Sequence, residues 1–216
     1  MIDVKPKNYY QNLRQEVADY IDNTPKFILE IGCGEGNFGH AIGEKYDAEV
    51  WGIEPTESYA NKAKQKLHKV YIDTVENALE ELPQHKFDLI VANDVLEHLV
   101  DPYTVLKTFH KNLAKQGRVI SSIPNMRNFH VFYQLSRHKN WEYQESGVLD
   151  RTHLRFFTTN SIKNMYDNCG YSVIKHEGIN PETNLPRWFN LLNTLSGKRF
   201  DDMRFLQFVT VAEVRK

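Results

Sequence analysis

The sequence has little cysteine, proline or glycine, and it has no long apolar run. Its two cysteines, Cys33 and Cys169, form no C-x-x-C pair, which excludes a disulfide framework or a thiolate zinc site. With 11 glycines and 8 prolines in 216 residues, of which 41% are hydrophobic, the chain is not disordered. No run approaches the ~18–20 apolar residues of a membrane helix, and residues 1–10 hold no hydrophobic signal core. We therefore expect a cytoplasmic protein without membrane insertion.

The chain also lacks an excess of charge of either sign. The formal net charge is −1 and the isoelectric point is about 6.8, so no general basic field is available to hold a polyanion. We therefore expect no DNA partner. At about 150 residues per domain, the length predicts a single domain over 1–216 with some elaborations.

Short β-rich runs alternate with helical patterns through the first half of the chain. The pattern predicts strands at 27–31, 49–53, 69–72, 87–92 and 117–122, with helices at 36–46, 55–68, 75–82 and 102–114. This alternation is typical of an α/β fold with a parallel sheet and right-handed crossovers. Such sheets bind ligands beyond the carboxyl ends of their strands, so the residues after each strand are the candidate site.

Other segments frame this core. A helix is predicted at 8–21, so residues 1–24 form an N-terminal helix or a lid that could place Tyr9, Tyr10 and Arg14 over a ligand. Two late strands are predicted at 171–176 and 205–214. The stretches 123–160 and 178–204 are too long for plain connections and predict insertions that carry function-specific structure. The lysines at 62, 64, 66 and 69 predict a solvated helix face.

A glycine loop directly follows the first predicted strand. Segment 30–36, EIGCGEG, places Gly32, Gly34 and Gly36 between that strand and a helix, where the backbone can turn sharply and approach a ligand. Gly34, Gly36 and Gly39 also match the dinucleotide pattern G-x-G-x-x-G, but two residues late relative to the strand end. A tight turn that binds nothing is the third interpretation.

Acidic residues follow the next two strands. Glu54 ends the second strand, where a carboxylate can accept both ribose hydroxyls of a nucleoside; alternatively it serves the dipole of the following helix. Asp73 follows the third strand, where it could accept an adenine amino hydrogen or simply cap a helix. Thr74 and Val75 would flank the adenine. These signals at successive strand ends favour a nucleoside site.

Segments 28–36, 52–55 and 87–98 together resemble the class I S-adenosylmethionine-dependent methyltransferases. The resemblance implies a Rossmann-like, seven-stranded, mostly parallel sheet with helices on both faces and an antiparallel last strand. It implies S-adenosylmethionine as cofactor and S-adenosylhomocysteine as product. The cofactor-binding residues that it implies are Glu30, Gly32, Cys33, Gly34, Glu54, Pro55, Asp73, Thr74, Val75, Asn93 and Asp94.

The segment after the fourth strand carries the candidate chemistry. His98 is a candidate general base, or else a hydrogen-bonded structural histidine. Asp94, Glu97 and His98 stand at i, i+3 and i+4, which suits a divalent metal or a helix capping box. The segment is similar to the metal-binding motifs of small-RNA 2′-O-methyltransferases and quinone-biosynthesis O-methyltransferases, with His153 as a fourth candidate ligand. The sequence leaves both alternatives open, and we assign no metal from it.

Segment 150–158, DRTHLRFFT, resembles methyltransferases encoded with glycosyltransferases for bacterial surface polysaccharides. The resemblance implies a sugar hydroxyl, or a glycan or nucleotide-linked precursor, as acceptor. Arg151 and Arg155 beside aromatic residues suit a sugar ring or a phosphate, or else form structural ion pairs.

We therefore predict an S-adenosylmethionine-dependent O-methyltransferase of polysaccharide biosynthesis that acts on a sugar or another polar hydroxyl, with His98 and His153 as catalytic candidates. One alternative is metal-assisted O-methylation of a quinone-like phenol or an RNA terminus. Another is a regulatory subunit that binds the cofactor without turnover.

Overall fold

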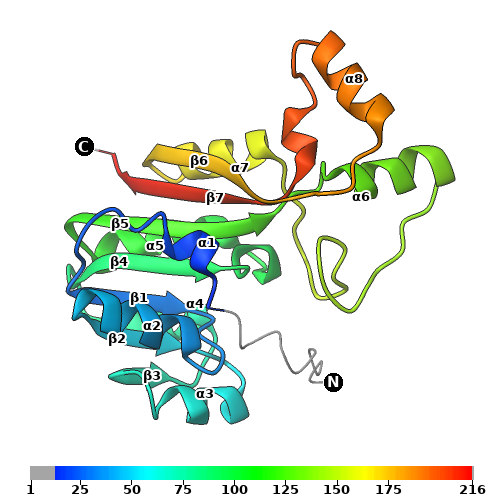
Figure 1. Ribbon diagram of the computed structural model, residues 1–216. Coiled ribbons are helices and arrows are strands. Elements are labelled where there is room, and N and C mark those ends of the chain that lie inside the picture. The colour runs from blue at the N-terminus through cyan, green and yellow to red at the C-terminus, as the bar shows by residue number, and fades with distance from the viewer. Residues whose placement is uncertain (1–12, 216) are drawn as a thin grey trace.

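A computed structural model describes residues 13–215 of the chain as one seven-stranded sheet with helices packed against it (Figure 1). The strand order is β3-β2-β1-β4-β5-β7-β6. The strands are β1 Phe27–Ile31, β2 Glu49–Ile53, β3 Lys69–Tyr71, β4 Phe87–Asn93, β5 Leu113–Pro124, β6 Tyr171–Pro181 and β7 Phe205–Val214. All seven predicted strands are therefore present.

Eight α-helices and three short helical turns lie in the described part of the chain. They are α1 Gln15–Ala18, α2 Asn37–Tyr46, α3 Glu57–Ala63, α4 Val75–Glu81, η2 Leu96–His98, α5 Pro102–Asn112, α6 Phe129–Tyr133, η3 Gln134–His138, α7 Thr159–Asn168, α8 Arg187–Leu195 and η4 Asp201–Arg204. Asp101 caps α5 with its side chain, and Thr158 with Ser161 forms a capping box on α7.

Strands β1 to β5 pair in parallel, whereas β7 runs antiparallel between β5 and β6. In the register, Ile31 lies opposite both Ile53 and Ala92. The residues that follow β1, β2 and β4 consequently meet at one edge of the sheet. The predicted α/β fold with an antiparallel last strand is confirmed.

The two faces of the sheet are buried under different helices. Leu29 and Ile31 of β1 belong to the core on one face, while Ile28 belongs to the core on the other. This alternation follows from the period of two in a strand, since successive side chains point to opposite faces. Each such side chain contributes about 1.5–3 kcal/mol when it is fully buried, so both faces fix the register of β1.

Two predicted helices are shorter in the structure. The helix predicted at 55–68 ends at Ala63, because His68 leaves it to pair with β2: its backbone N–H donates to Val50 O at 2.9 Å, and its Nδ1 accepts from Val50 N at 3.1 Å. Within the described residues, the helix predicted at 8–21 contains only Gln15–Ala18. The predicted positions of Tyr9 and Tyr10 lie outside the described residues.

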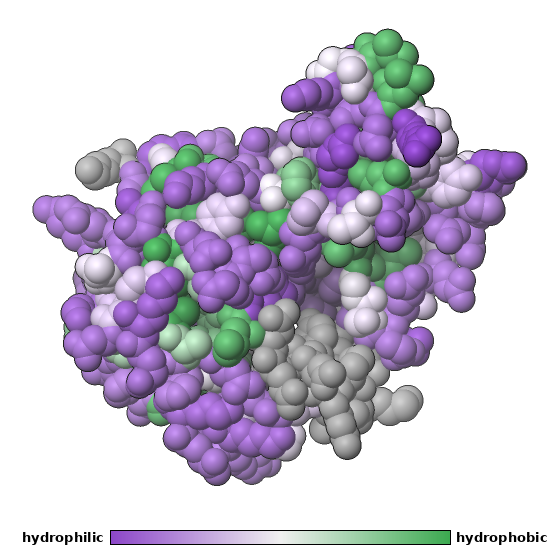
Figure 2. All heavy atoms as spheres, viewed as in Figure 1, coloured by the Kyte–Doolittle hydropathy of each residue, from purple (hydrophilic) through white to green (hydrophobic). Residues whose placement is uncertain are grey.

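The two stretches predicted as insertions hold α6 and η3 in 123–160, and α8 and η4 in 178–204. Helix α8 packs on α6 through Phe189 and Phe129, whose ring centroids are 4.8 Å apart, and it stands away from the sheet (Figure 1). Hydrophobic atoms gather at its outer end (Figure 2). Across residues 13–215, no helix is long and apolar enough to cross a membrane.

Candidate active site

The glycine loop turns the chain from β1 into α2. Gly32, Gly34 and Gly36 have φ angles of 66°, 52° and 75°, in the left-handed region that favours glycine. A Cβ on Gly32 would lie 2.7 Å from Val95 Cγ2, and one on Gly36 would lie 3.1 Å from the Ala63 backbone. The loop therefore requires glycine both for its conformation and for close packing.

Glu54 holds this loop from the end of β2. One carboxylate oxygen accepts from Gly34 N at 3.0 Å, and the other accepts from Thr56 N at 2.9 Å. The side chain is buried. A carboxylate oxygen can accept more than one hydrogen bond, so Glu54 retains capacity for a ligand while it fixes the loop.

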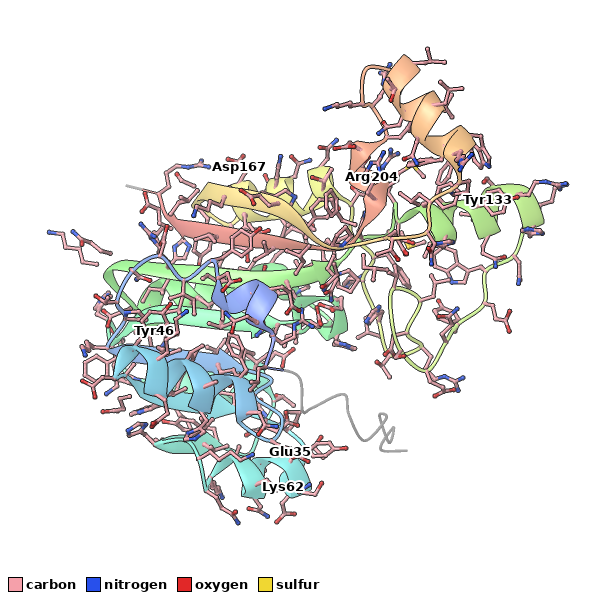
Figure 3. All side chains as sticks on the ribbon, viewed as in Figure 1. Glu35, Tyr46, Lys62, Tyr133, Asp167 and Arg204 are labelled. Carbon is pink, nitrogen blue, oxygen red and sulfur yellow. The ribbon has the colours of Figure 1, made fainter. Side chains whose placement is uncertain are left out.

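Lysines of the α3 region hold the outer side of the loop. Lys62 Nζ lies 2.6 Å from Glu35 Oε1 (Figure 3), and Lys66 Nζ donates to Glu35 O at 2.8 Å and to Asn37 Oδ1 at 2.6 Å. The predicted solvated face holds for Lys62, which is exposed, whereas Lys66 is partly buried against the loop carbonyl and the Asn37 amide oxygen.

A cavity of about 720 Å³ opens beside the glycine loop. Most of the predicted cofactor residues line it, together with His98: Glu30, Gly32, Cys33, Gly34, Glu54, Pro55, Thr74, Val75, Asn93 and Asp94. Asp73 is not in this lining; its Oδ1 accepts from Thr74 N at 2.7 Å and from Asn77 Nδ2 at 2.9 Å, so it contacts the start of α4 without accepting from a backbone N–H of that helix. The assignment of Asp73 to an adenine edge stays a prediction.

Asn93, at the end of β4, is among the residues that line this cavity. Its amide nitrogen and oxygen are both enclosed, and neither has a hydrogen-bond partner among residues 13–215. An enclosed amide costs free energy unless something satisfies it. Asn93 is therefore suited to contact a ligand that occupies the cavity.

Glu30 is a second enclosed acid in the lining. Burial raises the pKa of Glu30 to about 8. A hydrogen bond from the Gly39 backbone opposes this rise, and the charge of Glu54 adds to it. Its Oε2 has no hydrogen-bond partner in the described chain. The carboxyl group is therefore mostly protonated at neutral pH.

This pKa predicts a pH-dependent stability. Folded Glu30 holds its proton up to about pH 8, whereas in the unfolded chain it releases it near pH 4.5. The free energy of unfolding therefore falls across this window, by at most about 1.4 kcal/mol per pH unit for this group. We expect the melting-temperature difference, wild type minus Glu30→Gln, to decrease from pH 5 to pH 8. Parallel plots of melting temperature against pH for the two proteins would contradict this prediction. Glu44→Gln changes an exposed glutamate and is the control.

Asp94 does not share a helical face with Glu97 and His98, although their i, i+3 and i+4 spacing in the sequence suggested it. Its φ is 52°, in the left-handed region, and the helical turn that follows β4 begins only at Leu96. Its carboxylate contacts Arg14 Nη1 at 2.5 Å, Ser122 Oγ at 2.9 Å and Gln207 Nε2 at 2.7 Å. Asp94 thus joins the N-terminal region, β5 and β7.

Glu97, His98 and His153 form a compact cluster. Their ligand-type atoms all lie within 4.8 Å of one another, and the two imidazole rings meet edge to face with centroids 4.7 Å apart. Glu97 is buried, and neither carboxylate oxygen has a hydrogen-bond partner in another described residue. Burial first, and then the charge of Asp94, raises the pKa of Glu97 well above its ordinary value.

The 148–155 loop positions both histidines. The backbone N–H groups of Leu154 and Arg155 donate to Glu97 O at 2.9 and 3.0 Å. His153 Nδ1 lies 3.1 Å from Val148 O, and His98 Nδ1 lies 3.1 Å from Thr152 O. A proton on each Nδ1 donates to these carbonyls and leaves Nε2 as the acceptor or ligand atom.

A second cavity of about 290 Å³ lies on the other side of the Arg14–Asp94 pair, which lines both cavities. Glu97, His153 and Gln207 line the second cavity, whereas His98 lines the first. The cluster therefore lies where the two cavities approach each other. Two ligands, one in each cavity, can therefore both reach the same set of acid–base groups.

A family model described as a methyltransferase domain matches residues 5–176. The chain belongs to this methyltransferase family. The glycine loop, the strand order and the antiparallel β7 agree with a class I S-adenosylmethionine-dependent enzyme rather than a nicotinamide enzyme. The fold is similar to that of a SAM-dependent methyltransferase from Archaeoglobus fulgidus, with a TM-score of 0.66 and 16% identity over 94% of this chain and 91% of the other.

Curated relatives match about half of this methyltransferase. A ubiquinone biosynthesis O-methyltransferase of Bradyrhizobium diazoefficiens is 34% identical over 110 residues, which are 49% of this chain and 42% of the relative. One of Proteus mirabilis is 32% identical over 130 residues, 57% of this chain and 51% of the relative. The chain thus spans about half the length of the curated relatives it matches.

The residues of this methyltransferase also fit a divalent metal. The Glu97–His98–His153 cluster offers one carboxylate and two imidazoles, and hydrogen bonds at Nδ1 orient both imidazoles as in metal sites. The two unsatisfied oxygens of Glu97 agree with a bound cation. Imidazole ligands favour Zn²⁺ or Fe²⁺ over Mg²⁺, and the carboxylate also suits Mn²⁺.

Sequence reasoning missed parts of the site that come from distant segments. Ser122 and Gln207 gave no motif signal, although they hold Asp94. Thr152 lies within segment 150–158, and its hydroxyl lies 2.7 Å from Asp150 Oδ1 and 3.2 Å from His98 Nδ1. In the sequence, only the Thr152-His153 pair shortly after Asp150 could have indicated that Asp150, Thr152 and His98 contact one another.

Proposed function

We propose that this methyltransferase transfers the methyl group of S-adenosylmethionine to a hydroxyl oxygen of a sugar, a glycan or another polar compound. In this proposal Glu54 accepts the ribose hydroxyls, Thr74 and Val75 flank the adenine, and Asn93 lies at the sulfonium end. The volume of the first cavity and the unsatisfied amide of Asn93 support this placement.

The observation that carries the proposal is the position of the Glu97–His98–His153 cluster between two cavities. The cofactor occupies the first cavity and the acceptor the second. The acceptor oxygen forms a bond to the methyl carbon as the carbon–sulfur bond breaks, and S-adenosylhomocysteine leaves. The hydroxyl proton passes to an imidazole Nε2 of the cluster, so His98 and His153 serve as base and positioning residue.

Aromatic side chains near His153 support a ring-shaped acceptor. The Phe156 ring lies 6.5 Å from His153 and 5.3 Å from Trp141, and Trp141 lies 6.3 Å from Tyr143. Phe156, Trp141 and Tyr143 are all exposed, although large aromatic groups usually bury their faces. An exposed aromatic surface beside the second cavity is suited to stack on the face of a sugar or of a phenol.

Mass spectrometry tests the proposed acceptor class. The purified protein is incubated with S-adenosylmethionine and fractionated bacterial extract, and products that gain a methyl group are hydrolysed and analysed. An O-methyl sugar supports the proposal, and an O-methyl phenol supports the second candidate below. Methyl groups only on nitrogen or sulfur, or no transfer to any component, would contradict both.

Metal-assisted O-methylation of a quinone-like phenol is the second candidate. Its support is the partnerless carboxylate of Glu97 beside two oriented imidazoles, together with the names of the curated relatives. Glu97, His98 and His153 would hold the ion. When bound, such an ion lowers the pKa of a coordinated hydroxyl and removes the need for a strong base.

Chelation separates the two candidates. For the metal-assisted enzyme we expect exhaustive chelation to lower turnover at least tenfold and Mn²⁺ or Zn²⁺ to restore it. Calorimetric titration of Mn²⁺ gives a readout without activity: Glu97→Gln lowers the affinity at least about tenfold. Glu80→Gln, at an exposed position of α4, leaves the affinity unchanged. Undiminished turnover after chelation rules out the metal-assisted candidate.

A further inference from the structure

Helix α8 carries its apolar residues on the outside. Trp188, Leu191, Leu192 and Leu195 follow at i, i+3, i+4 and i+7, so they form one stripe, the α8 apolar face. Their exposed fractions are 53%, 62%, 47% and 77%. Single apolar residues are common on protein surfaces, but four large ones in one stripe form a contiguous apolar patch.

The inner side of α8 is held partly by polar contacts. Asn193 is buried; its Nδ2 donates to Asp201 Oδ1 at 3.1 Å, and its Oδ1 accepts from Phe200 N at 2.9 Å. Arg204 donates to Asn190 Oδ1 at 2.7 Å, from the turn below α8 (Figure 3). These contacts fix the rotation of the helix, so the outward direction of its apolar face is built into the fold.

The charge around this face is of one sign. Residues 186–200 contain Arg187, Lys198 and Arg199 and no acidic residue. All three are exposed, and none forms an ion pair within the described chain. The acidic residues just outside this stretch are engaged: Asp201 pairs with Arg204, and Asp202 pairs with Arg127. Positive charge without a described acidic partner therefore lies at both ends of α8, in a chain whose net charge is −1.

We propose that the α8 apolar face docks this protein on an anionic lipid bilayer. An amphipathic helix with Trp and Leu on one side and basic residues beside them lies in the plane of the membrane interface. Each basic residue near the surface adds to the attraction by anionic lipids. A second copy of the chain is disfavoured as occupant, because a symmetric contact would bring the same three cations of both copies together. The inference does not depend on the identity of the methyl acceptor.

Vesicle sedimentation with the full chain tests this proposal. We expect binding to phosphatidylcholine vesicles that contain about 30% phosphatidylglycerol, little binding to pure phosphatidylcholine, and weaker binding as salt rises. Leu191→Gln/Leu195→Gln and Arg187→Gln/Lys198→Gln/Arg199→Gln should each lower binding at least about tenfold. Trp188 fluorescence should shift to the blue on binding, and Trp188→Phe should remove the shift.

Control variants distinguish this face from general stickiness. Ile174→Gln changes an exposed apolar residue on β6, and Lys45→Gln/Lys64→Gln/Lys115→Gln removes three exposed charges elsewhere. Both should bind like the wild type, and all variants should keep the wild-type melting temperature because the changed side chains are exposed. No vesicle binding, equal loss in the controls, or a dimer in solution that Leu191→Gln/Leu195→Gln dissociates would each overturn the proposal.

Discussion

Glu54→Ala is expected to abolish the rise in melting temperature that S-adenosylhomocysteine gives the wild type. The buried carboxylate fixes the loop through Gly34 N and the helix start through Thr56 N, and its remaining acceptor capacity faces the cavity. Without this carboxylate, the two ribose hydroxyls lose their hydrogen bonds to a charged group, which lowers the affinity for S-adenosylhomocysteine by about a hundredfold or more. Thermal shift and calorimetric titration with S-adenosylhomocysteine measure this loss.

Glu57→Gln is the matched control, because Glu57 is an exposed acid in the first turn of α3. It should retain the full ligand-induced shift. NAD should stabilise neither protein. Stabilisation of the wild type by NAD, or a full S-adenosylhomocysteine shift in Glu54→Ala, would contradict the assignment of the cavity to this cofactor.

His153→Asn is expected to lower turnover at least about a hundredfold and to leave S-adenosylhomocysteine affinity unchanged. The asparagine amide can still donate to Val148 O, which His153 Nδ1 contacts at 3.1 Å, so the loop keeps its anchor. The variant lacks an atom at the place of Nε2, 3.9 Å from Glu97 Oε1. Affinity persists because His153 lines only the second cavity.

The exposed histidine of α2, His40, provides the control variant His40→Asn, which should keep both turnover and affinity. The separation of the two readouts is the informative result. Wild-type turnover in His153→Asn would remove His153 from the chemistry. Loss of cofactor affinity in that variant would show instead that the 148–155 loop shapes the first cavity.

Much of the fold could be predicted from local pattern because it depends on local physics. The strand at 205–214 was predicted with its observed bounds, since the apolar residues in its middle, 208–212, are buried on both faces. The end of α3 could not be predicted, because it depends on the pairing of His68 with Val50 in a neighbouring strand. Helical pattern alone favoured continuing the helix to His68.

The two halves of the site were predictable to different degrees. The glycine loop and Glu54 follow their strands directly, so chain position placed them at the edge of the sheet. Arg14 and Gln207 are 193 positions apart, and no spacing rule joins them around Asp94. The polysaccharide acceptor inferred from segment 150–158 stays a prediction, as does the adenine contact of Asp73.

The position of β7 has a consequence for the order in which the chain can fold during synthesis. Strand β6 is made before β7 but joins the sheet only through it, since β7 lies between β5 and β6. As the ribosome releases the chain, β1 to β5 can assemble while β6 still lacks a partner. Gln207 of β7 then reaches Asp94 last of all, so the wall between the two cavities closes only when synthesis of this strand is complete.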